Sequence, residues 1–352
     1  MTYQSQKKYI GHISQLFNVK EYEYTSGRAR GSRAVDVSNG AGLSFTVGVD
    51  RCMDFTSMNY KGVNLSYLAP AGIVAPEYYS DKELDFLRSF AAGLLTTCGI
   101  ESSGSPSRSD GEAYPLHGRI GNAPAENVCV DVDDSGEPTV TLKGRMREAR
   151  LFGQNLRLTR TIRCTYGENA VRFTDEIENI GTRESSMMML YHFNMGYPLL
   201  SEHSRFVLPT LRCEPRDAHA AEGIESWNVI EPPIHGFAEM CYFLTLARDE
   251  HGRSFACIYN DELELGLVLR FDAALLDHFT MWKQIGETEY VVGLEPCMQY
   301  PDGREAAIAD GSIKYIAPGE KKTLDFSIEI VDGRDALERI SAEAAALTAN
   351  AE

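Results

Sequence analysis

The sequence lacks any long apolar run. The opening residues, Met1 to Lys8, are polar and lead into mixed sequence, with no stretch that could serve as a leader or a membrane span. We therefore expect no signal peptide, no contact with a membrane, and a cytoplasmic location.

Several motifs are also absent. The 8 cysteines form no C-x-x-C pair, which argues against a zinc ribbon or a disulfide framework. Neither H-x-x-x-H nor H-E-x-x-H occurs, and we find no G-x-S-x-G elbow, phosphate loop or dinucleotide fingerprint. The segment 118–121 lacks the glycine spacing of the last of these. We expect neither a cofactor nor a metal.

Basic residues are scarce relative to acidic ones. The chain has 34 Lys and Arg against 51 Asp and Glu, a formal net charge of -17. The field of such a surface repels phosphate backbones, so we expect no nucleic-acid partner. A small neutral ligand feels little of that field. The oligomeric state is left open.

Strand periodicity dominates the 352 residues. The segment 156–164 alternates apolar and polar residues, and 171–179 does so again after a turn, which predicts an antiparallel meander. No strand-helix-strand rhythm appears. Further strands are expected at 42–49, 128–132, 139–142, 187–193, 242–246, 254–259, 265–271, 290–294 and 324–330. The predicted class is all-β, with one domain over residues 1–352.

Helical signals are few. Ser80 and Glu83 form a capping box ahead of apolar residues, which predicts a helix. The Ala- and Glu-rich tail predicts a second helix, at about 335–348, packed on the edge of the sandwich. The Ser- and Gly-rich segment 101–111 is either a mobile lid or an ordinary surface loop.

Four short segments place a titratable or cationic residue beside turn-forming residues: 87–90, 114–122, 191–197 and 292–297. In the third, His192 and Asn194 share one side of the expected strand and can project into one cleft. Glu295 ends a run of strand formers, where a carboxylate is costly to bury unless it is solvated, paired or functional. The alternatives are a hydrogen-bonded structural histidine and an edge-strand charge that deters aggregation.

From about residue 49 to residue 330, these segments in this order resemble the aldose 1-epimerase, or galactose mutarotase, family, and in particular a less characterised bacterial branch of it. The resemblance implies a single antiparallel β-supersandwich with a few short helices. It places Arg88 at the family's Arg, His117 at the His before Gly, His192 at the second His, and Glu295 at the late acid. The family's Asn is replaced here by Leu87.

The implied activity is interconversion of the anomers of a free sugar, without a cofactor. Opening a cyclic hemiacetal removes the anomeric hydroxyl proton and gives one to the ring oxygen, so we expect Glu295 as base and His192 as acid. Arg88, His117 and Asn194 would hold the sugar, and Trp282 would offer it an aromatic face. The family's hydroxyl-binding Asp has only Asp217 and Asp277 as candidates.

Three other functions remain open. Another sugar-processing enzyme on this fold would need a second acid in the pocket if it hydrolysed glycosides. A non-catalytic carbohydrate-binding or sensing protein would need only hydrogen bonders and a platform such as Trp227 or Trp282. A metal site would take His117, His192 and Glu295 as ligands.

Arg51, Arg119 or Lys283 could adapt the cleft to an acidic sugar.

Overall fold

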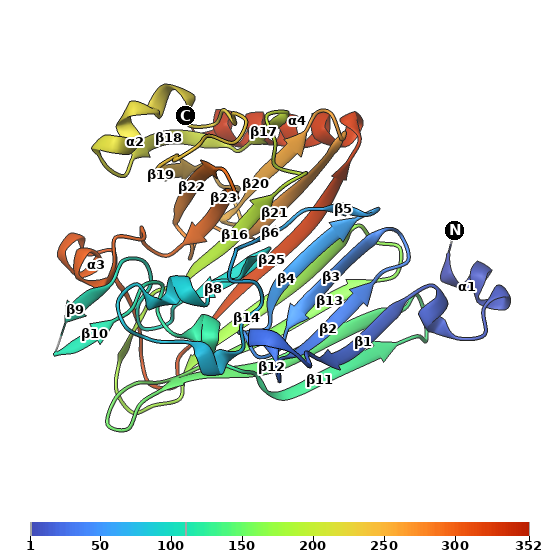
Figure 1. Ribbon diagram of the computed structural model, residues 1–352, viewed down its shortest axis with the longest axis horizontal. Coiled ribbons are helices and arrows are strands. Elements are labelled where there is room, and N and C mark those ends of the chain that lie inside the picture. Colours follow the sequence, from blue (N-terminus) through green and yellow to red (C-terminus); the bar gives the residue numbers. More distant parts are fainter. Residues whose placement is uncertain (1, 110, 352) are drawn as a thin grey trace.

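The protein is built almost entirely of antiparallel strands (Figure 1). The computed structural model describes residues 2–109 and 111–351. Three sheets of five, eight and six strands form two layers, and three two-stranded ribbons complete the set. The all-β prediction is confirmed.

The eight-stranded sheet forms one layer. Its meander from β12 to β14 has the predicted alternation, with Leu158 opposite Ile177 on the buried side. In order across the sheet, its strands are β11 (Glu126–Asp133), β12 (Thr139–Ala149), β13 (Asn155–Thr165), β14 (Ala170–Asn179), β25 (Lys321–Asp332), β21 (Leu265–Asp272), β20 (Arg253–Asn260) and β17 (Ser204–Val207).

The other two large sheets share the opposite layer. The five-stranded sheet has β1 (Asn18–Glu23), β2 (Arg33–Ser38), β3 (Leu43–Gly48), β4 (Asp54–Tyr60) and β5 (Val63–Asn64) in sequence order. The six-stranded sheet has the order β18 (Thr210–Pro215), β19 (Met240–Leu246), β22 (His278–Gly286), β23 (Glu289–Cys297), β16 (Leu190–Gly196) and β8 (Leu95–Cys98). The ribbons pair β6 (Tyr67–Leu68) with β7 (Ala92–Gly93), β9 (Ser107–Ser109) with β10 (Glu112–Tyr114), and β15 (Ser185–Met187) with β24 (Lys314–Ile316).

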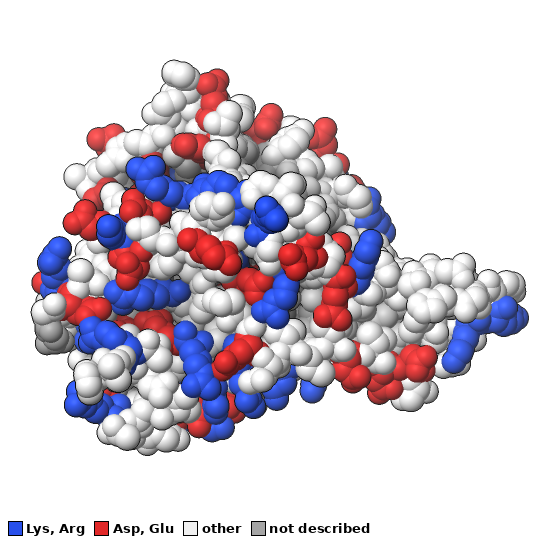
Figure 2. Space-filling view, turned by 60° about the horizontal axis from the view of Figure 1, so that its bottom comes forward, with Lys and Arg blue, Asp and Glu red and all other residues white. Residues whose placement is uncertain are grey.

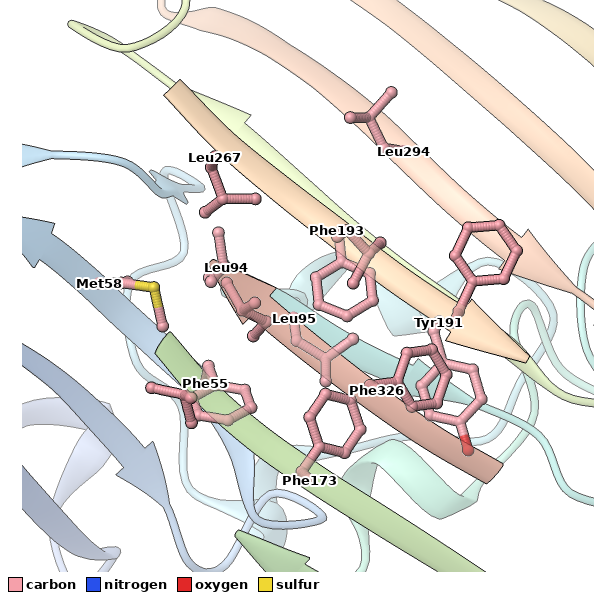
Figure 3. Packing of buried hydrophobic residues seen from close by; sticks show 14 of the residues in the cluster. Phe55, Met58, Leu94, Leu95, Phe173, Tyr191, Phe193, Leu267, Leu294 and Phe326 are labelled. Carbon is pink, nitrogen blue, oxygen red and sulfur yellow. The ribbon is translucent and has the colours of Figure 1, made fainter. Parts of the chain in front are cut away.

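Aromatic side chains join the two layers (Figure 3). Phe173 of β14 stacks on Phe326 of β25 with ring centroids 4.5 Å apart, and it also meets Phe55 of β4 at 5.7 Å. Phe193 of β16 approaches Phe326 at 6.2 Å. The eight-stranded sheet therefore packs on both sheets of the other layer. The side chains on β16 that alternate with this core set face away from it.

A buried ion cluster ties the layers together. Arg160 of β13 is fully buried, and its guanidinium donates to Asp54 of β4 and Asp175 of β14, each at 2.6 Å, and to Thr97 of β8 at 2.9 Å. Buried charges are tolerated only with such pairing.

Helices are short except at the end of the chain. Residues 334–351 form α4 (Arg334–Ala351), which buries Leu337, Ile340 and Ala344 against the outer side of β20 and β21. The face it buries is the one predicted for the tail. The other α-helices are α1 (Tyr3–Gln6), α2 (Ala218–Glu222) and α3 (Arg304–Asp310). The 3-10 helices are η1 (Lys7–Tyr9), η2 (Ile13–Gln15), η3 (Gly27–Ala29), η4 (Pro76–Tyr78), η5 (Asp85–Arg88), η6 (Ile120–Asn122) and η7 (Ile224–Ser226).

The helix predicted after the capping box is wrong. Ser80 donates its hydroxyl to the carboxylate of Asp85 rather than capping a helix, and Glu83 has a positive φ of 43°. Only the single turn of η5 follows, because the chain here covers one side of a cavity and its apolar residues are divided between a buried and an exposed side.

The segment predicted as a lid or loop contains strand β9, which pairs with β10. Asp110 of this segment lies outside the described residues. The backbone N–H of Ser105 donates to the carbonyl of Pro301, and a side chain at Gly104 would collide with Pro301. This close approach anchors the start of the segment to the loop after β23.

Surface charge is mixed on the face shown in Figure 2, where acidic and basic side chains alternate without one large basic area. In the described part of the chain, none of the helices has the length and apolarity needed to span a bilayer.

Candidate active site

The candidate site lies on the side of the six-stranded sheet that faces away from the core. The β16–β23 ladder pairs Leu190 with Cys297 and Phe193 with Leu294, a register that sets His192 directly opposite Glu295. Side chains opposite each other in a ladder share one face of the sheet. His192 and Glu295 therefore project from the same face of the sheet.

The two functional groups touch. Nε2 of His192 lies 3.2 Å from Oε1 of Glu295, and the residues are 5% and 2% exposed. Gly293, two residues before Glu295, leaves the space that they use. A Cβ there would lie under 3.0 Å from Oε1 of Glu295 and only 3.2 Å from Cε1 of His192. The glycine is required by this close approach.

Burial favours the uncharged forms of both groups. It lowers the pKa of His192 to about 3, and the neighbouring His117 acts in the same direction. Burial also raises the pKa of Glu295 well above its usual value. Glu239 adds to this rise, and Arg216 opposes it. Both shifts favour a neutral imidazole beside a protonated carboxyl group.

His117 reaches the same place from a loop. Its φ is 59°, and the next residue, Gly118, has a φ of 72° and packs so closely on the carbonyls of Gly99 and Ser102 that a Cβ would not fit. Its ring lies 5.5 Å from that of His192, and its Nδ1 is buried without a hydrogen-bond partner. Burial lowers its pKa to about 4. Strained backbone and an unpartnered polar atom at one residue are typical of a ligand site.

These groups line a cavity of about 780 Å³. One wall is the sheet face, which contributes His192 and Glu295 together with alternate residues of β22 and β23. The opposite wall comes from the excursion between β6 and β7 and from the loop that holds His117. The remaining polar lining residues on the sheet side are Arg216, Glu239, Thr280, Trp282, Gln284 and Glu289.

Glu239, Arg216 and Trp282 form a hydrogen-bonded group beside the His192–Glu295 pair. Glu239 accepts the indole N–H of Trp282 at 2.7 Å on one oxygen and the guanidinium of Arg216 at 3.3 Å on the other. Arg216 also donates to Asp217 and to the thiol of Cys241. Its five N–H donors are thus nearly all used, and it faces the cavity as half of an ion pair.

Trp282 lines the cavity, as expected of a residue that offers an aromatic face. Its ring lies 5.3 Å from that of His192. Asn194 is fully buried beneath the site and does not line the cavity. Its amide donates to the carbonyl of His192 at 2.8 Å. It fixes the strand under the histidine instead of pointing into the cleft.

The expectation that Arg88 shares this cavity is wrong. Its side chain is 80% exposed, pairs with Asp85, and belongs to the outside of the excursion, while Phe86 and Phe90 point inward. A single turn of 3-10 helix directs neighbouring residues to different sides, so Leu87 reaches the cavity mouth and Arg88 does not.

The other cations proposed from the sequence also lie elsewhere. Arg51 donates hydrogen bonds to three backbone carbonyls. Arg119 forms ion pairs with Asp81 and Glu112, and Lys283 forms one with Glu231 and also donates to a backbone carbonyl. Of the two acids suggested as hydroxyl binders, Asp217 caps α2 and Asp277 pairs with Lys314, and neither lines the cavity. The acids that do line it, besides Glu295, are Glu239 and Glu289.

Part of the missed set has a signal in the sequence. Thr280 and Gln284 alternate with the predicted Trp282 along β22 as His192 and Asn194 do along β16, so the period of two marks them once the strand is recognised. Arg216 and Glu239 have no such pattern, because both lie just outside strands. Within residues 2–109 and 111–351, no group of three or more His, Cys, Asp and Glu is arranged to hold a metal ion.

Comparisons with known proteins assign the chain to a family and show which solved structures share its fold. A family model described as a domain of unknown function (DUF4432) matches residues 29–330. A structure from Klebsiella pneumoniae, named for a proposed aldose 1-epimerase activity, superposes with a TM-score of 0.91 at 25% identity over 96% of this chain and 90% of that one.

More distant structures share the fold. A galactose mutarotase-like protein from Clostridium acetobutylicum has a TM-score of 0.63 at 13% identity, over 90% of this chain and 99% of that one. A galactose 1-epimerase from Lactobacillus acidophilus has a TM-score of 0.58 at 13% identity, over 90% of this chain and all of that one. No curated protein matches the sequence.

Proposed function

The chain belongs to the DUF4432 family, whose description states no function, and from this premise we propose that the protein interconverts the anomers of a free sugar. The observation that carries the proposal is the buried contact between His192 and Glu295 at the floor of a large cavity. An acid and a base within reach of each other and of one ligand are what hemiacetal chemistry needs.

The reaction requires two proton transfers. In the proposed first step, neutral His192 accepts the proton of the anomeric hydroxyl while the carboxyl group of Glu295 gives its proton to the ring oxygen. The bond between the anomeric carbon and the ring oxygen breaks, leaving an open-chain aldehyde, an imidazolium and a carboxylate. After the aldehyde has turned, ring closure returns both protons and restores the pair.

This order reverses the roles expected from the sequence, where Glu295 was the base. To start as a base, Glu295 would have to be ionised, and its burial opposes ionisation. The neutral resting pair needs no charge to be buried before the sugar enters, which is the cheaper arrangement in a desolvated site.

The remaining polar groups would hold the sugar. His117 lines the cavity and is only partly buried, so its imidazole ring can contact a ligand. Glu239 keeps free acceptor capacity, and Arg216 is neutralised by its carboxylate partners. With no unpaired cation among the described lining residues, the cavity favours an uncharged sugar.

A second candidate is hydrolysis of a glycoside, since Glu239 and Glu289 place further acids in the cavity. Glu239, however, accepts hydrogen bonds from a guanidinium and an indole, which occupy both of its oxygens. This role suits holding better than proton donation. Release of a reducing sugar from a panel of glycosides would favour hydrolysis instead.

The test is NMR exchange spectroscopy on free aldoses, neutral and acidic, with and without the protein. We expect faster exchange between the anomers of at least one neutral sugar, well above the spontaneous rate. The matched blank is the Glu295→Gln protein at the same concentration. Binding of sugars without accelerated exchange of any of them would favour a carbohydrate-binding or sensing protein.

A further inference from the structure

The cavity has two chemically different halves. The sheet side is polar and holds the His192–Glu295 pair. The opposite side, formed by the excursion after β6 and the loop that holds His117, has an apolar wall of Pro70, Leu84, Phe86, Leu87, Phe90 and Leu116. A sugar ring seated on the polar half would leave most of this wall uncovered.

The volume of the cavity supports a ligand larger than one sugar. A hexose has about 12 non-hydrogen atoms, which would fill no more than ~360 Å³ even if each took the ~30 Å³ of a water molecule in the liquid. The cavity measures about 780 Å³. Roughly half of it is therefore available to something attached to the ring.

The apolar wall is tightly packed at its inner end and exposed to solvent at the mouth of the cavity. Phe86 packs on Phe90 at 5.1 Å and on the ring of His117 at 5.2 Å, so the wall is continuous with the catalytic floor. Leu84 and Leu87 stand at the outer end and are 57% and 56% exposed. The two leucines extend the apolar wall to the solvent, so a ligand that leaves the cavity on this side would cover them.

We propose that this outer half binds an apolar group carried by the sugar at the end of the ring opposite the anomeric carbon. The inference rests on the proposed function, because the His192–Glu295 pair fixes where the anomeric carbon lies. In a pyranose the opposite ring position is carbon 4, so an apolar substituent on the oxygen of that carbon would extend toward Leu84 and Leu87.

The experiment compares three free sugars as ligands: glucose, 4-O-benzylglucose and maltose, which has a polar extension at the same position. Affinities are measured by calorimetry. The benzyl compound should bind about tenfold more tightly than glucose, since covering some tens of Å² of apolar surface gives a gain of that order. Maltose should show no comparable gain.

The matched variants change leucines alone. In the double variant Leu84→Ser, Leu87→Ser the benzyl compound should lose its advantage while glucose binds as before. Leu68→Ser, at the end of β6 just before the excursion, is 54% exposed but outside this cavity, and it should leave all three affinities unchanged.

Equal affinities for glucose and the benzyl compound, no binding of the benzyl compound, or a gain that survives in the double variant would each overturn the proposal. An equal gain in affinity for maltose would also overturn it. So would a wild-type dimer, seen by sedimentation, that the double variant no longer forms, because the leucines would then contact a second copy of the chain. A benzyl-specific gain without accelerated anomer exchange would remove the proposed function and leave the apolar site standing.

Discussion

Gly293→Ala tests whether the placement of Glu295 matters, without touching either reacting residue. The added Cβ would lie under 3.0 Å from Oε1 of Glu295, whereas ordinary contact begins at 3.4 Å. The carboxyl end of Glu295 can swing away, but it must do so by on the order of 1 Å, and a misplacement of that size can cost about 100-fold in rate.

The stability cost should be small by comparison. The same Cβ would meet Cβ of Trp282 at 3.1 Å, which a few tenths of an ångström of movement relieves. Mild overpacking of this kind costs about 1 kcal/mol, or about 2 °C in Tm for a protein of this size. The variant should therefore stay folded and lose nearly all anomer exchange.

Gly286→Ala is the matched control. Gly286 ends β22, and the nearest atom to its added Cβ is Oε1 of Gln284 at 3.4 Å, an ordinary contact. It should keep both the wild-type Tm and the wild-type exchange rate. A folded Gly293→Ala protein as active as this control would refute the reasoning that the His192–Glu295 geometry sets the rate.

Other predictions concern residues with separate roles. Arg88→Ala should leave sugar affinity and exchange rate unchanged by calorimetry and NMR, because its side chain faces solvent outside the cavity. Arg160→Leu leaves two buried aspartates unpaired and should lower the free energy of unfolding in urea by about 3–5 kcal/mol. Burial lowers the pKa of His117 to about 4 in the folded protein, against 6.5 for a free histidine. As the pH falls from 6.5 toward 4, this histidine is therefore protonated in the unfolded chain but not in the folded one, and the protein loses free energy of unfolding. His117→Asn should reduce the difference between urea unfolding at pH 7 and at pH 5, and an unchanged difference would contradict the buried neutral state.

The strands were accessible from the sequence because a period of two is local information. The alternation in 156–164 and 171–179 predicts β13 and β14 within a residue or two. The division into three sheets was not accessible. Strand β25 lies between β14 and β21 in the sheet, although more than 140 residues of sequence separate it from β14. Nothing local in either strand encodes that pairing.

Of the residues proposed from the sequence, His117, His192, Trp282 and Glu295 line the cavity, and Arg88 and Asn194 do not. His192 and Glu295 are brought together by ladder register, which the shared family order anticipated and the period of two permits. The prediction for Arg88 was wrong because the direction of its side chain depends on a single 3-10 turn. Glu239 was missed because it lies just before β19 and not within the strand. Side-chain direction outside regular elements is set by tertiary contacts that one sequence does not reveal.

The central claim is that His192 and Glu295 exchange protons with the anomeric centre of a sugar. It is tested most directly by NMR exchange rates of the accepted sugar with wild type, Glu295→Gln, His192→Asn and the double variant. Each single variant should lose on the order of a hundredfold, and the double variant much less than the product of the two losses, because the residues act as one unit. A folded Glu295→Gln protein that equilibrates the anomers at the wild-type rate would contradict the account.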